Sequence, residues 1–112
     1  MNYTPYERKI TRAKIEKYGT IACIEKAIEE STELTDALIE LRNTIKSKRS
    51  IAVTVACIME AAMEYADVAI SVDDTMQLLF SDIWSAAVEG KRDLVYKERL
   101  PKLLNDDEVQ RA

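Results

Sequence analysis

The segment SIAVTVACIMEAAMEYADVAIS, residues 50–71, decides the fold of this chain. Read as a helix, it is apolar around most of its circumference, whereas an ordinary surface helix is polar over about half of it. Its later polar residues recur at helical spacing and form one line along the helix: Glu60, Glu64, Asp67 and Ser71. Because burying carboxylates is costly without compensation, this line either faces solvent or pairs with cations, of which we favour a bound metal ion.

The composition predicts one all-α domain covering residues 1–112. A chain of 112 residues that is 47% hydrophobic can bury one core and is short for two. With only 2 glycines, 2 prolines and short β-branched runs, the sequence favours helices.

Charge and cysteine content narrow the class of protein. The formal net charge of -4 argues against a protein that binds nucleic acid by neutralising phosphates. No apolar run approaches the roughly 20 residues of a membrane span. Cys23 and Cys57 both fall in apolar helical patterns, and we recognise no signal peptide, so we expect reduced core thiols in a cytoplasmic protein.

Capping and stop signals divide the chain into an antiparallel bundle of about four helices. Thr4, Pro5 and Glu7 form a capping box that starts the first helix, and Gly19 ends it. Ser50 caps the third helix, for which Gly90 is the next stop signal. The expected helices cover residues 5–18, 20–45, from 51 toward 90, and 92–104, the last with Pro101 inside it.

The second of these helices has an apolar arc with an acidic residue at its margin. At 100° per residue, one arc gathers Cys23, Ala27, Leu34, Leu38, Leu41 and Ile45. Glu30 lies beside this arc, where an amphipathic pattern does not favour a charge. Glu33 lies closer to the solvated acidic flank, which is formed by Glu25, Glu29, Asp36 and Glu40.

Two pairs of carboxylates, spaced three residues apart, can converge if these helices pack antiparallel: Glu30 with Glu33, and Glu64 with Asp67. Four carboxylates suit a hard divalent cation, Mg²⁺ or alternatively Mn²⁺. Such an ion keeps water and phosphate oxygens in its remaining positions, so its natural chemistry is hydrolysis at a phosphate.

Spacing alone does not establish a metal site. An acidic content of 20 in 112 residues produces roughly three such pairs by chance, and the apolar setting of Glu64, Asp67 and Glu30 is what strengthens the pattern. A solvated stripe or salt bridges between helices are equally compatible with it. The absence of histidine excludes Ser-His and Cys-His nucleophiles, so any general base is a carboxylate or a metal-bound hydroxide.

The two-part acidic pattern resembles a known family. Glu29-Glu30-Ser31-Thr32-Glu33, followed by Glu64-Tyr65-Ala66-Asp67, is similar to the EExxE … ExxD signature of the MazG-like all-α nucleoside triphosphate pyrophosphohydrolases. The flanking segments, residues 17–19 and 96–100, also resemble short members of that family. The likeness covers residues 17–104.

The resemblance implies hydrolysis of a (deoxy)nucleoside triphosphate to the monophosphate and pyrophosphate with Mg²⁺. It assigns metal binding and catalysis to Glu30, Glu33, Glu64 and Asp67. Lys97 and Arg99 match phosphate-contacting cations more loosely, and Trp84 is available to stack on a base, although a core position is commoner for such a residue. Members are homodimers or homotetramers, which agrees with the apolar excess of residues 50–71. The alternative is a non-catalytic helical interaction or regulatory protein with the same bundle.

Overall fold

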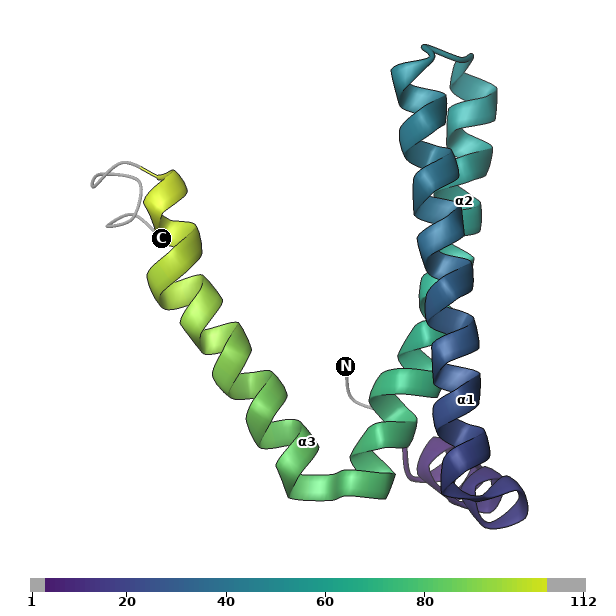
Figure 1. Ribbon diagram of the computed structural model, residues 1–112, viewed down its shortest axis with the longest axis vertical. Helices are drawn as coiled ribbons and strands as arrows, with labels where there is room; N and C mark the ends of the chain where they lie inside the picture. Colours follow the sequence, from purple (N-terminus) through teal and green to yellow (C-terminus); the bar gives the residue numbers. More distant parts are fainter. Residues whose placement is uncertain (1–3, 105–112) are drawn as a thin grey trace. The chain divides into compact units, whose positions relative to one another are not determined.

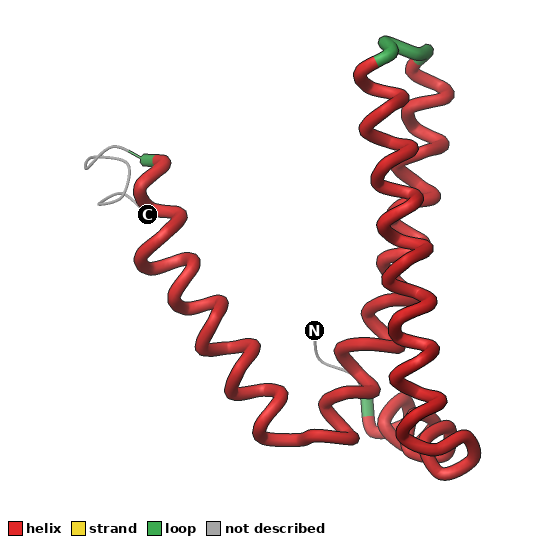
Figure 2. Tube along the Cα trace, viewed as in Figure 1, coloured by secondary structure: helices red, strands yellow, loops and turns green. Residues whose placement is uncertain are grey.

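The computed structural model describes residues 4–104, and all regular structure in that range is helical, as predicted (Figure 2). The chain forms two compact units, one up to Leu79 and one from Phe80 onward. Within the described residues, no helix combines the length and the hydropathy needed to cross a membrane.

The first helix begins where the sequence predicts. α1 spans Pro5–Lys46, with Thr4 as its N-cap and Pro5 in its first turn. The Glu7 N–H donates to Thr4 Oγ1 at 3.1 Å, and the Thr4 N–H donates to Glu7 Oε1 at 2.8 Å. Both hydrogen bonds of the capping box are therefore present, and they hold the pKa of Glu7 below its usual range.

Gly19 interrupts α1 as predicted, although the helix resumes at once. Its backbone (φ 84°, ψ 167°) lies in a region that is essentially restricted to glycine. α1 therefore consists of two straight segments, residues 5–18 and 20–46, that meet at a kink (Figure 1).

The long segment of α1 and α2 (Ile51–Val68) form the antiparallel hairpin that the sequence predicts (Figure 1). The side of α1 against α2 has a seven-residue repeat with alternating steps of four and three, and its buried members are Cys23, Ala27, Glu30, Ala37 and Thr44. The predicted arc is wrong at two positions, because Leu38 is 50% and Ile45 is 57% exposed. The straight pairing of two helices follows a repeat of 3.5 residues rather than the 3.6 of an isolated helix, so Ala37 and Thr44 take the buried positions.

A π-helix, η1 (Ala69–Asp74), continues α2 and packs against α1. The hydroxyl of Thr75, which is completely buried, donates to the Ile70 carbonyl at 2.8 Å and accepts from Lys14 Nζ at 2.7 Å. This chain of hydrogen bonds connects the short first segment of α1 to the end of η1. Asp73 and Asp74 lie in this wider helical turn.

The helix α3 (Thr75–Leu94) crosses the boundary between the units and is interrupted at Ser81 (φ 47°, ψ −121°). The predicted stop at Gly90 is wrong, because α3 continues through it. A glycine inside a helix costs only about 1 kcal/mol relative to alanine, which is too little to end a helix that its neighbours favour. A second π-helix, η2 (Val95–Arg99), and a 3₁₀-helix, η3 (Leu100–Leu103), follow, and Pro101 lies in the first turn of η3.

Candidate metal centre

The centre of the candidate site is Glu30, which occupies a buried position of the α1–α2 hairpin. Its neighbours in the repeat, Cys23, Ala27 and Ala37, are small or apolar. Glu30 itself is only 6% exposed. On α2, Glu64 is half-buried and Asp67 is exposed.

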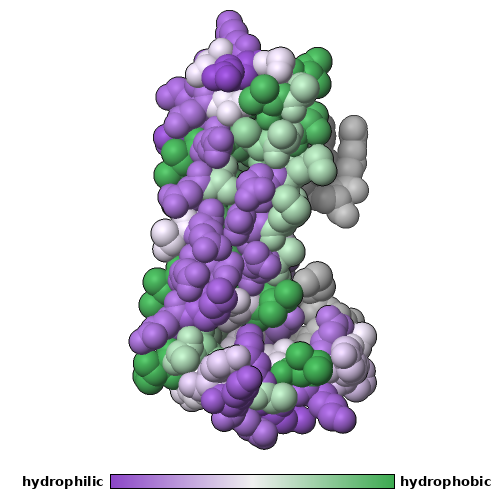
Figure 3. Space-filling model, turned by 90° about the vertical axis from the view of Figure 1, so that its right-hand side faces the viewer, coloured by the Kyte–Doolittle hydropathy of each residue, from purple (hydrophilic) through white to green (hydrophobic). Residues whose placement is uncertain are grey.

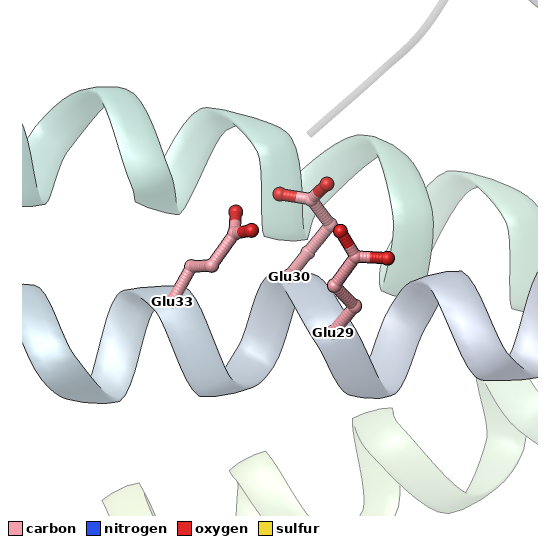
Figure 4. Close-up of side chains that lie close together, drawn as sticks. All are labelled: Glu29, Glu30 and Glu33. Carbon is pink, nitrogen blue, oxygen red and sulfur yellow. The ribbon is translucent and has the colours of Figure 1, made fainter.

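The hairpin brings carboxylates of both helices together. One oxygen from each of Glu30, Glu64 and Asp67 lies within 4.8 Å of the others. The same limit holds for a second triad, Glu29, Glu30 and Glu33, all on α1. Figure 4 shows Glu30 and Glu33 extending from α1 toward α2, with Glu29 beside Glu30. Glu30 thus belongs to both triads, one within α1 and one across the hairpin.

Two oxygens in this cluster are buried without a hydrogen-bond partner among the described residues: Glu30 Oε2 and Glu64 Oε2. A buried carboxylate oxygen without a partner loses its hydration and gains nothing in return. Coordination to a divalent cation would give such an oxygen the partner that it lacks. Carboxylate oxygens are the ligands that Mg²⁺ and Mn²⁺ prefer, so the donor set fits the predicted metal.

One cation already contacts the cluster. Lys26 Nζ lies 2.8 Å from Glu30 Oε1 and 3.6 Å from Glu29 Oε1. Its hydrogen bond lowers the pKa of Glu30 despite the opposing effect of burial, and the pKa of Lys26 is raised in return. Glu30 is therefore ionised, with Lys26 on one oxygen and Oε2 left over.

The other carboxylates show that Lys26 does not compensate the whole cluster. The negative charge of Glu30, together with burial, raises the pKa of Glu33. Burial is the largest cause of the raised pKa of Glu64, and the adjacent carboxylates of Glu60, Glu33 and Asp67 raise it further. The site therefore has an excess of negative charge on partly desolvated carboxylates, which a bound divalent cation would stabilise.

The four predicted ligands are thus gathered around Glu30, but they do not form a single group. Glu64 and Asp67 join Glu30 across the hairpin, whereas Glu33 joins it along α1. The sequence does not single out Lys26. It places Glu29 on the solvated flank, and Glu29 is indeed exposed, but its carboxylate also joins the triad with Glu30 and Glu33. The position of Lys26 four residues before Glu30 was a usable signal, because that spacing places the two side chains together on a helix.

The predicted substrate residues lie in the second unit. Trp84 is half-buried in α3, and Lys97 and Arg99 are exposed in η2. Lys97 Nζ lies 3.6 Å from Asp93 Oδ2, with both side chains largely exposed. Their assignment to the substrate stays a prediction.

No protein-family model matches the chain, and neither does any curated protein or solved structure. The fold and the site by themselves define a class: an all-helical protein with a carboxylate cluster suited to a divalent cation.

Proposed function

We propose that this protein is a Mg²⁺-dependent hydrolase that cleaves a (deoxy)nucleoside triphosphate to the monophosphate and pyrophosphate, as MazG-like all-α pyrophosphohydrolases do. The observation that carries the proposal is the pair of buried, unpartnered oxygens, Glu30 Oε2 and Glu64 Oε2, with Asp67 in the same triad. The order of the acidic residues along the chain, EExxE and then ExxD, supports the same class.

The residues have distinct roles in this proposal. Glu30, Glu64 and Asp67 would hold the metal across the hairpin, and Glu33 would support it from α1. The metal, when bound, polarises the phosphoryl group and lowers the pKa of a coordinated water. Glu33 is the carboxylate with a raised pKa on the open side of the cluster, so it is suited to accept a proton from the attacking water.

The alternative is a helical interaction protein, and the exposed apolar surface of α2 favours it. Only Ala61 of α2 is buried, whereas Ile51, Met59 and Met63 are each more than half exposed. Figure 3 shows hydrophobic residues exposed among hydrophilic ones on one face of the molecule. A second copy of the chain would cover such a surface, so we also propose a homodimer or homotetramer, to be checked by sedimentation. Assembly is compatible with either function.

The deciding experiment measures pyrophosphate release from a panel of ribo- and deoxynucleoside triphosphates, with Mg²⁺ and with a chelator. We expect release that requires the metal, with a monophosphate as the second product. If the folded protein releases pyrophosphate from none of them, the interaction protein becomes the better explanation.

A further inference from the structure

A cavity that is partly open to solvent lies at the kink at Gly19, and no member of the two carboxylate triads is among its described lining residues. Its volume is about 340 Å³, within the range of small-ligand sites. Lys14 and Tyr18 line it from the segment before Gly19, and Ala22, Cys23 and Lys26 line it from the segment after. The cavity therefore exists only because α1 bends back on itself.

The charges at this cavity favour an anion. Among the described residues that line it, Lys14 and Lys26 are the ionised ones, and the carboxylates of Glu29 and Glu30 contact Lys26 from outside this lining. Lys14 is held in place by its hydrogen bond to Thr75 Oγ1, which uses one of its three N–H groups. Ala22 and Cys23 belong to the first turn of the helical segment after Gly19, where the helix dipole contributes further positive potential.

Glu30 connects this cavity to the metal centre. Its Oε1 accepts from Lys26, which lines the cavity, whereas its Oε2 is the unpartnered oxygen of the carboxylate cluster. The two oxygens of one carboxylate are only about 2 Å apart, so the cation at Lys26 and a metal on Oε2 would be neighbours. Lys26, which lines the cavity, and a metal on Oε2 would thus offer two cationic contacts that share the Glu30 carboxylate.

We propose that the cavity is the polyphosphate subsite of this protein, in which Lys26 and Lys14 bind phosphates of the nucleotide that lie beyond the metal. This inference rests on the proposed function and deepens it, because it makes a chain of phosphates, rather than a base or a single phosphate, the feature that is recognised. It also assigns phosphate binding to the first unit, whereas the sequence resemblance pointed to Lys97 and Arg99, which lie in the second unit.

The test measures binding of inorganic tripolyphosphate to the full chain by calorimetry, in chelator, so that neither metal nor hydrolysis is involved. Lys14→Gln should weaken binding about tenfold, the usual loss of one charge-assisted hydrogen bond. Lys9→Gln, which removes an exposed lysine from the same helical segment, should leave it unchanged. Inorganic phosphate should bind more weakly than tripolyphosphate.

A second variant covers the chance that Lys14→Gln disturbs the contact with Thr75. Ala22→Glu places a carboxylate at the mouth of the cavity, and the fold should accept it because Ala22 is exposed and lies in a first helical turn. It should abolish tripolyphosphate binding.

The outcomes separate this proposal from the proposed function. If Ala22→Glu and Lys14→Gln bind tripolyphosphate as the wild type does, or if tripolyphosphate binds no better than phosphate, the subsite is overturned even where Mg²⁺-dependent hydrolysis is found. If both variants lose binding while the wild type hydrolyses no nucleotide, the anion site stands and the hydrolase fails. If the anion site and the hydrolase activity are both found, Lys14→Gln should raise KM about tenfold and leave kcat within about twofold.

Discussion

The two units of this chain contain the same kinds of charged residue but differ in how far they bury these side chains. In the first unit, Glu30 and Asp74 are buried at 6% exposure each, and burial raises the pKa of Asp74. In the described part of the second unit no residue is buried, and the Lys97–Asp93 pair is exposed on both sides. The difference in burial, rather than in composition, separates them.

Burial decides what a charged group can do. Water screens an exposed pair such as Lys97–Asp93, which is therefore worth little. Around Glu30 the carboxylates have lost part of their hydration, so each affects the ionisation of the next and an arriving cation is strongly favoured. We therefore propose that the chemistry takes place in the first unit.

The largest expected effect is loss of turnover on removing a ligand charge from the hairpin. Glu64→Gln should lower kcat/KM at least about a hundredfold, because metal coordination contributes several kcal/mol to stabilising the transition state. Folding should be intact or improved, since the change removes one of several crowded carboxylates. Steady-state kinetics and thermal unfolding of the same sample measure both.

The matched control for that variant is Glu25→Gln, an exposed glutamate of α1 outside both triads. It should retain wild-type kinetics. If Glu64→Gln unfolds, or if the two variants lose activity equally, the metal centre is not where the hairpin places it.

The next effect, on stability, contrasts one glycine from each unit. Among the described residues, a Cβ added at Gly19 or Gly90 would meet no atom within 4 Å beyond the neighbouring backbone, so alanine meets no clash at either. Gly19→Ala should destabilise the protein by about 1–3 kcal/mol, because its φ of 84° is unfavourable for any other residue. Gly90→Ala should instead stabilise α3 by about 0.5–1 kcal/mol, because it lies in the helix interior. Denaturant unfolding gives both values, and equal signs would contradict the kink.

The sequence predicts much of the first unit because its signals are local. The capping box at Thr4, the break at Gly19 and the cap at Ser50 depend on residues within a few positions, and the structure has all three. The burial of Glu30 depends instead on which side of α1 meets α2. The predicted arc, which wrongly included Leu38 and Ile45, left Glu30 at its margin because it assumed a lone helix.

The cavity at Gly19 could not be predicted for a related reason. The lysines that line it, Lys14 and Lys26, lie on separate helical segments and are ordinary surface residues in any helical pattern. Only the angle at the kink brings them to one cavity, and Thr75, more than fifty residues later, fixes Lys14 there. Helical periodicity contains no information about that contact.

The smallest effect, a pH dependence, would sharpen the contrast between buried and exposed carboxylates. The raised pKa values of Glu64 and Glu33 mean that the folded state binds these protons more tightly than the unfolded state does. In chelator, stability should therefore rise as the pH falls from neutral through these raised pKa values. Glu30 and Glu7, whose pKa values are lowered, oppose this trend only where the pH approaches the ordinary carboxyl pKa, because there the unfolded chain takes up these protons and the folded state does not.

With Mg²⁺ present the trend should reverse, because metal and proton compete for the same oxygens. Affinity for Mg²⁺ should fall by up to about tenfold per pH unit below the pKa of Glu64, where one proton must leave for the metal to bind. Thermal unfolding at each pH, with Mg²⁺ and with chelator, should show a metal-induced rise in Tm that shrinks toward acid. A rise that is equally large at every pH would mean that the ion binds to exposed carboxylates elsewhere. The buried cluster at Glu30 would then have no special role.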